Sequence, residues 1–132
     1  MVNPHNGQEL EVLSSTPELL VLETTYEPGG MQPPAHFHPE QDEHFEVLEG
    51  ELHVLLDGHE RSVAAGETID VPRGMVHSMW GGGDVQTRVR WETRPALRTE
   101  QFLRTIWGIA AGDEGDAMAV LAEYSREFRL VT

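Results

Sequence analysis

Short runs of strand-forming residues, separated by segments rich in glycine and proline, occupy most of the sequence between residues 9 and 91. Strands are predicted at 9–14, 19–26, 43–48, 52–56, 61–65, 68–71, 75–79 and 85–91. Asp57-Gly58, between two of these runs, is the strongest signal for a tight hairpin turn. Many short strands at even spacing are typical of an all-β sandwich or barrel.

Helical periodicity replaces the strand pattern after Pro95. One helix is predicted from residue 99 to about residue 111, with Thr99 as its N-cap. A second helix is predicted to start near Asp116, and apolar residues recur at helical spacing as far as Phe128. We interpret the apolar sides of both helices as surfaces that pack on the barrel or on a partner subunit.

Length and charge limit the classes of protein to which the chain can belong. Residues 1–132 are predicted to form one domain, with the barrel in about 9–94 and the helical segment in about 97–129. The absence of cysteine excludes disulfides and thiolate metal sites. The formal net charge is −14, with 23 acidic residues against nine basic ones, so nucleic acid and membranes are poor partners. Without a signal peptide or a membrane-length apolar run, we expect a cytoplasmic domain that binds a small molecule.

Two histidines and a glutamate form the first group of candidate site residues. His36 and His38 are separated by one residue, so in a strand both imidazoles lie on the same face. Glu43 begins the next predicted strand and shares its face with Phe45 and Val47. Two imidazoles and a carboxylate that converge on an apolar surface are the components of a divalent-metal site.

A second group of residues precedes and includes His77. Pro72 and Gly74 are expected to bend the chain just before this histidine, and strand alternation puts Met79 on the same face as His77. The same alternation predicts an apolar pocket, which favours a hydrophobic or aromatic ligand. The predicted lining residues are Phe45, Val47, Leu52, Val54 and Met79.

The two groups together resemble the paired sequence motifs of the cupin superfamily. The first matches as Gly30, five residues, His36-x-His38, four residues, Glu43, six residues and Gly50. The second matches as Gly66, five residues, Pro72-x-Gly74, two residues and His77. The superfamily pattern usually ends in asparagine where this chain has Gly81, and both residue types tolerate a left-handed backbone. The resemblance implies a double-stranded β-helix, or jelly-roll, barrel, followed in this chain by the two helices.

The resemblance also implies that His36, His38, Glu43 and His77 are metal ligands. Nitrogen and oxygen ligands without sulfur suit one divalent transition metal, and they leave Fe, Mn, Ni, Co, Zn and Cu all open. In octahedral geometry such a set leaves two positions for water, dioxygen or substrate. The predicted pocket contains no dedicated general acid or base, so the metal, its water and Glu43 as catalytic residue would carry the chemistry.

Three functions are compatible with these features. We expect a metal-dependent enzyme, and specifically an oxygenase that acts on an apolar or aromatic small molecule. The alternatives are a redox-neutral metal enzyme, such as a polyketide-type cyclase or an isomerase, and a non-enzymatic metal- or ligand-binding module. By resemblance to single-domain cupins we also expect a homodimer that pairs through sheet edges and covers the apolar strands 10–13 and 19–22.

Overall fold

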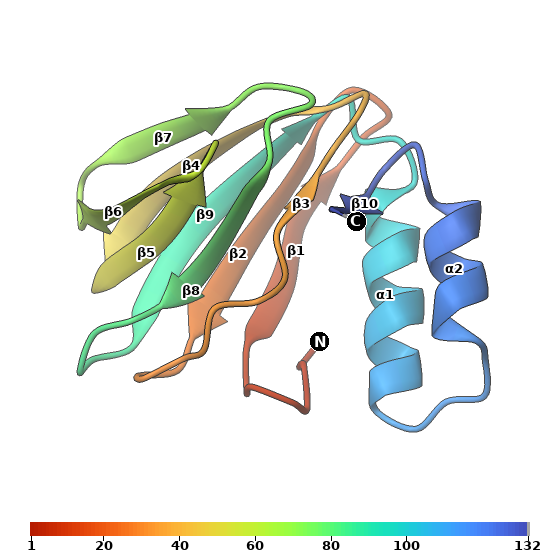
Figure 1. Cartoon of the computed structure of the whole chain (residues 1–132), viewed down its shortest axis with the longest axis horizontal. Helices are drawn as coiled ribbons and strands as arrows, with labels where there is room; N and C mark the ends of the chain where they lie inside the picture. Colours follow the sequence, from red (N-terminus) through yellow and green to blue (C-terminus); the bar gives the residue numbers. More distant parts are fainter. Residues whose placement is uncertain (132) are drawn as a thin grey trace.

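Two five-stranded antiparallel sheets and two helices make up the protein, as a computed structural model of residues 1–131 shows (Figure 1). The first sheet has the strand order β1-β2-β9-β4-β7, and the second has the order β10-β3-β8-β5-β6. The strands of the first sheet are β1 (Glu9–Ser15), β2 (Leu20–Tyr26), β9 (Thr87–Arg94), β4 (Asp42–Glu49) and β7 (Thr68–Val71). Those of the second are β10 (Arg129–Leu130), β3 (His36–Phe37), β8 (His77–Gly81), β5 (Glu51–Leu56) and β6 (His59–Ala64). The helices are α1 (Thr99–Ala110) and α2 (Ala117–Glu123).

Alternating side chains of the central strands form the main core of the molecule. Residues such as Val47 in β4, Leu52 in β5 and Val89 in β9 are almost completely buried there, while their neighbours along each strand are more exposed. Burying one face of each sheet is the expected outcome of a period-2 apolar pattern. The predicted hairpin is confirmed, because Asp57 and Gly58 both have positive φ angles, of 48° and 83°, in the turn between β5 and β6.

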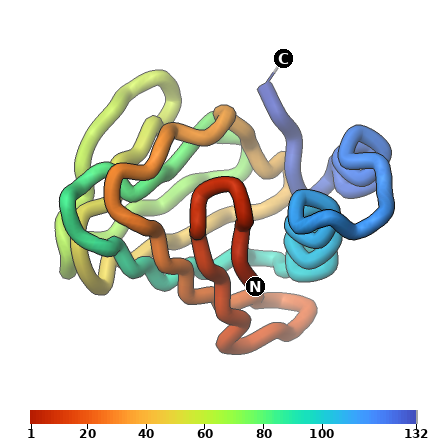
Figure 2. Tube along the Cα trace, turned by 90° about the horizontal axis from the view of Figure 1, so that it is seen from below, coloured from red at the N-terminus to blue at the C-terminus, as the bar shows by residue number. Residues whose placement is uncertain are grey.

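The helices cover one side of the first sheet and form a second core with β1 and β2 (Figures 1 and 2). Leu10, Leu20 and Leu22 are buried there against Phe102 and Tyr124. Of the apolar strand residues for which a partner subunit was expected, these three are covered within the chain itself, whereas Leu13 is 42% exposed, and the homodimer stays a prediction. Among residues 1–131, neither helix is long and apolar enough to cross a membrane.

The ends of the helices differ from the predicted ends in two ways that matter for the site. Thr99 is the first helical residue, and Arg98 occupies the N-cap position without a capping side-chain hydrogen bond. The Thr99 hydroxyl oxygen instead accepts a hydrogen bond from Gln41 Nε2 at 2.8 Å. Asp116 does cap α2, with its carboxylate accepting from two backbone N–H groups. However, α2 ends at Glu123 and does not continue to Phe128. The chain after α2 turns back to the sheets and ends in β10, beside β3.

Gly81 is required by packing and not by a left-handed backbone, which corrects the expectation for this position. Gly81 lies in β8 without a left-handed φ. A Cβ atom on this residue would lie 2.7 Å from the Cβ of Tyr26, which is closer than two carbon atoms approach. Gly30 also approaches this strand closely, since its N–H donates to Gly81 O at 2.8 Å. Gly81 therefore allows the end of β2, at Tyr26, to lie against β8.

Replacing Gly81 with alanine is expected to lower the free energy of unfolding by about 1–3 kcal/mol, because the added methyl group overpacks against Tyr26. Gly83→Ala is the matched control, since the nearest atom to its added Cβ, Val85 N, is 4.0 Å away. Urea unfolding of both variants measures the difference. Equal stability of the two variants would contradict this explanation.

Candidate metal centre

The pairing of strands brings the candidate ligands together at one end of the space between the two sheets. β3 and β8 are neighbours, and their register puts His36 directly opposite His77. His38 follows β3, and β4 of the facing sheet supplies Glu43. The three histidines offer ring nitrogens that all lie within 4.8 Å of one another. Residues far apart in the sequence thus form one compact cluster.

Glu43 completes the cluster with one carboxylate oxygen and is held in place through the other. Its Oε1 lies 2.9 Å from His38 Nε2 and 3.2 Å from His77 Nε2. Its Oε2 accepts a hydrogen bond from Trp91 Nε1 at 2.5 Å. The structure therefore brings Glu43 beside two of the three clustered histidines, and it adds Trp91 as the residue that orients the carboxylate.

The outer nitrogens of the three imidazoles show which ring atoms face the centre. His38 Nδ1 lies 2.7 Å from Glu127 O, and His77 Nδ1 lies 2.9 Å from Met75 O. His36 Nδ1 approaches Pro34 O at 3.4 Å. A carbonyl oxygen only accepts, so each Nδ1 carries the proton and each Nε2 presents a lone pair to the cluster. This is the arrangement by which backbone carbonyls orient metal-binding histidines.

Two buried atoms in the centre lack the partner that they need. Among residues 1–131, His38 Nε2 and Glu43 Oε1 make no hydrogen bond, although they are only 2.9 Å apart, because neither atom carries a proton when Nδ1 is the protonated nitrogen of His38. Buried polar atoms without partners are costly, and both of these atoms are electron-pair donors. A divalent cation between them would satisfy both at once. The residues present thus fit a transition metal bound by nitrogen and oxygen.

Charge effects within the cluster determine where a proton sits when no metal is bound. Burial, followed by the charges of His77 and His38, lowers the pKa of His36 to about 3, so this imidazole is neutral at pH 7. Burial also opposes the charged form of His38, but the adjacent Glu43 carboxylate outweighs it and raises the pKa of His38 above 6.5. Burial likewise disfavours the Glu43 carboxylate, yet contacts with His38 and His77 hold its pKa well below its usual range. A proton on His38 therefore competes with a metal for the same lone pair.

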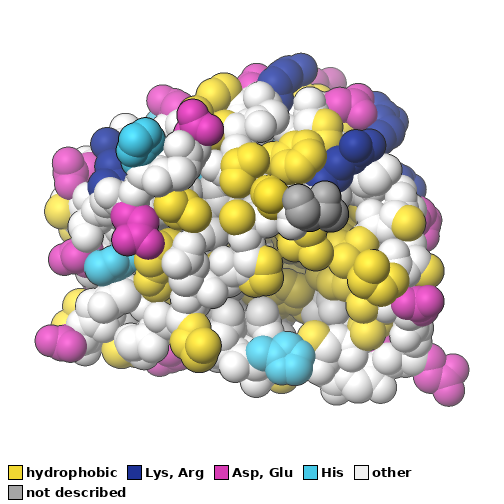
Figure 3. All heavy atoms as spheres, viewed as in Figure 1, with side chains coloured by type: hydrophobic (Ala, Val, Ile, Leu, Met, Phe, Trp, Pro, Cys, Tyr) yellow, Lys and Arg dark blue, Asp and Glu magenta, His cyan; other side chains and the backbone are white. Residues whose placement is uncertain are grey.

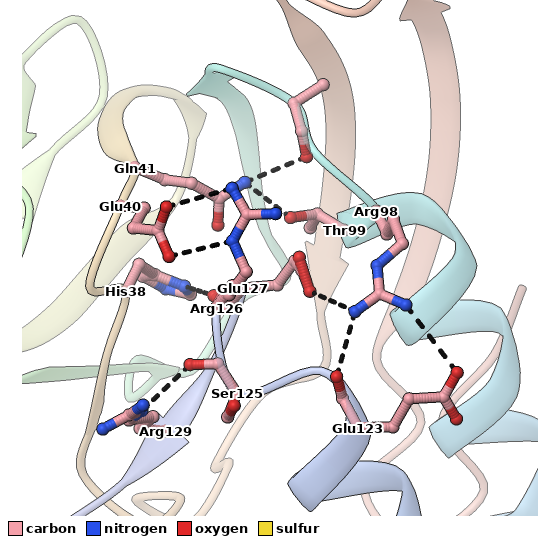
Figure 4. Close-up of polar contacts among 11 residues, drawn as sticks. His38, Glu40, Gln41, Arg98, Thr99, Glu123, Ser125, Arg126, Glu127 and Arg129 are labelled. Atoms are coloured by element: carbon pink, nitrogen blue, oxygen red, sulfur yellow. Dashed lines mark hydrogen bonds and ion pairs between the residues drawn. The ribbon is translucent and has the colours of Figure 1, made fainter.

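The segment after α2 contacts two of the histidines, which the sequence analysis did not anticipate. The Phe128 ring stacks on the His36 ring with centroids 4.6 Å apart and an interplanar angle of 25°. Glu127 supplies the carbonyl that accepts from His38 (Figure 4). Because of its helical spacing, Phe128 was predicted to belong to the second helix, so its contact with His36 was not predicted. Its true position depends on where α2 ends.

A cavity of about 230 Å³ adjoins the cluster and opens between the sheets and α1, where Figure 3 shows a hollow with hydrophobic walls. Of the predicted lining residues, Phe45 and Met79 line it. Val47, Leu52 and Val54 do not, because they are buried deeper in the core between the sheets. The wall opposite is formed by the helical segment, through Phe102, Leu103, Trp107 and Phe128.

Three comparisons place this geometry among known proteins. A family model described as "Cupin domain" matches residues 22–91, just over half of the chain. The chain is 38% identical over 69 residues to oxalate oxidase 1 of Hordeum vulgare, covering 46% of the chain and 34% of that relative. It is 38% identical over 111 residues to nectarin-1 of Nicotiana langsdorffii x Nicotiana sanderae, covering 77% of the chain and 47% of that relative. The chain thus spans less than half the length of both relatives.

A solved structure shows the same fold. The crystal structure of an RmlC-like cupin from Shewanella frigidimarina aligns with a TM-score of 0.66 and 22% identity, covering 75% of this chain and 86% of that one. It supports the jelly-roll arrangement of the two sheets, which confirms the expected fold. The motif residues, the family match and the fold agree with one another, and the chain belongs to the cupin family.

Proposed function

We propose that this chain is an oxygenase that uses one divalent transition metal, held by His36, His38, Glu43 and His77, and dioxygen as oxidant, to oxidise an apolar or aromatic small molecule. The observation that carries this proposal is the convergence of oriented lone pairs. Ring nitrogens of the three histidines lie within 4.8 Å of one another, Glu43 Oε1 lies within 3.2 Å of Nε2 of His38 and His77, and two of these atoms, His38 Nε2 and Glu43 Oε1, have no hydrogen-bond partner among residues 1–131. A centre built only for stability would pair these atoms with hydrogen-bond donors.

The residues around the centre have distinct tasks in this proposal. Trp91 holds the Glu43 carboxylate at a fixed angle, and the backbone carbonyls hold the imidazoles. Phe128 shields His36 from solvent by stacking on its ring. A bound divalent ion would supply the oxygen or Lewis-acid chemistry that these side chains lack.

The walls of the cavity support an apolar or aromatic substrate. Phe45, Trp91, Phe102 and Trp107 present aromatic surface to it from both sides. Within residues 1–131, no arginine lines the cavity, so beyond the metal itself a phosphate or a carboxylate would meet no guanidinium partner. A relative named as an oxalate oxidase supports oxidation chemistry on this fold, whereas the apolar walls favour a different substrate from oxalate.

Replacing His36 and His38 together with alanine is expected to abolish metal binding, because half of the proposed ligands are lost. Elemental analysis should change from about one metal ion per chain to almost none, while circular dichroism shows a retained β fold. His53→Ala is the control, since His53 contacts Glu51 and Trp80 and lies outside the cluster. Stoichiometric metal in the double variant would refute the ligand assignment.

Metal affinity is expected to rise with pH by at least about tenfold per unit between pH 5 and 6.5. In this range His38 lies below its raised pKa, so each binding event must release its proton. His36, with a pKa of about 3, is already neutral and adds no competing proton. Competition with a chelator of known pH dependence measures the slope. A flat profile would place any bound ion elsewhere on this acidic protein.

Oxygen consumption separates the proposed activity from its alternatives. The iron(II)-loaded protein, supplied with a panel of catechols and other aromatic enols, is expected to consume oxygen in step with loss of substrate. The double histidine variant serves as the inactive control. Turnover without oxygen consumption would support a cyclase or isomerase instead, and tight binding without turnover would support a binding module.

A further inference from the structure

A second carboxylate, Glu127, lines the cavity and belongs to neither cupin motif. Only 1% of this residue is exposed to solvent. Its backbone carbonyl already accepts from His38, so the residue lies next to the candidate metal centre. Figure 4 shows its side chain between Thr99, at the start of α1, and Arg98. Thr99 lines the same cavity.

Arg98 determines how the Glu127 carboxylate is oriented. Arg98 Nη2 donates to Glu127 Oε1 at 3.1 Å and to Glu123 O at 2.9 Å. The guanidinium also lies over the Tyr124 ring, 4.5 Å from its centroid. These contacts hold the cation outside the cavity and direct one oxygen of Glu127 toward it. The other oxygen, Oε2, is consequently left for a different partner.

Glu127 Oε2 has no hydrogen-bond partner in the part of the chain that the structure describes, residues 1–131. A buried carboxylate oxygen without a donor costs more than an exposed one. Pairing with Arg98 does not require this burial, since the Glu123 carboxylate lies 3.7 Å from the same guanidinium with its side chain 60% exposed. Because Glu127 lines the cavity, a molecule bound there is the nearest source of the missing donor.

We propose that Glu127 is a substrate-binding residue whose Oε2 accepts a hydrogen bond from a hydroxyl or N–H group of the molecule in the cavity. This inference rests on the proposed function and adds to it a substrate class. The substrate is apolar for most of its length and carries a neutral hydrogen-bond donor at the end that reaches Thr99 and Glu127. Glu127 also repels anionic groups, because the charge of Arg98 is already engaged with Oε1.

A set of simple chelators tests this inference with the cobalt(II)-loaded protein. Alkyl hydroxamates of four to seven carbons anchor one end at the metal, and their far ends are methyl, hydroxyl or carboxylate. At one chain length, the hydroxyl-ended probe is expected to bind about tenfold more tightly than its methyl-ended counterpart, as for hydrogen bonds to charged groups. The carboxylate-ended probe is expected to bind more weakly than both. Absorption titration of the cobalt centre gives the affinities.

Glu127→Gln is the diagnostic variant. Arg98 holds the amide oxygen of the glutamine at the position of Oε1, so an NH₂ donor replaces the acceptor Oε2. The hydroxyl end can still accept from this NH₂ group, but the bond is no longer to a charged group. The preference for the hydroxyl end should therefore fall to less than about threefold, and the carboxylate-ended probe should gain affinity. Glu123→Gln is the matched control, because it removes the exposed carboxylate beside the same arginine and should leave all three affinities unchanged.

Each outcome of these titrations decides the inference. Equal affinity for methyl and hydroxyl ends at every chain length in the wild-type protein would overturn it, even if the variant does not fold. An unchanged hydroxyl preference in Glu127→Gln would also overturn it. If no hydroxamate perturbs the cobalt spectrum, or no cobalt binds, the proposed function fails together with this inference. Binding of the methyl-ended probes without a preference for a donor would leave the proposed function standing and refute the role of Glu127 alone.

Discussion

Three hydrogen bonds from imidazole Nδ1 atoms to backbone carbonyls are the constraint on which the centre depends. They fix the protonated nitrogen of each histidine on the outside, so every Nε2 lone pair faces inward. The carbonyls come from Pro34, Met75 and Glu127, which lie in three different segments. The orientation of the ligands is therefore a property of the folded chain and would be lost if any of these segments moved.

Two buried carboxylates, those of Glu43 and Glu127, lie in the wall of a mostly apolar cavity and are held in the same way. Each carboxylate has one oxygen tied to a neighbouring donor, Trp91 for Glu43 and Arg98 for Glu127, and one oxygen without a partner. Tying one oxygen fixes the direction of the other, which is how a binding group is preorganised. In our proposals the free oxygen of Glu43 faces a metal and that of Glu127 faces a substrate. In both cases, fixing one carboxylate oxygen leaves the other for a ligand in the same cavity.

The helical segment has two structural roles that follow from its position. α1 and α2 cover Leu10, Leu20 and Leu22 and so complete the second core. The chain beyond α2 then returns to the sheets, where β10 pairs with β3 and Phe128 stacks on His36. An ion pair between Arg126 and Glu40, at 3.0 Å, joins this return to the loop between β3 and β4. The cavity wall opposite the sheets is therefore formed by α1 and the chain after α2, which are additions to the two sheets of the jelly roll.

The sequence by itself determined eight of the ten strands to within three residues and the Asp57-Gly58 hairpin, because period-2 alternation acts over a few residues, and motif resemblance supplied the four candidate ligands. The two-residue strands β3 and β10 were not predicted, since they are too short to show a pattern. It did not determine which apolar residues line the cavity, since Val47 and Phe45 share one strand face while only Phe45 reaches it. The positions of Trp91, Phe128 and Glu127 beside the candidate ligands were also decided only by the tertiary structure. Their contacts join positions 48 to 92 residues apart, and such pairings follow from strand register and from the end of α2. Which of these residues contact one another is therefore set by tertiary packing and not by local secondary-structure propensity.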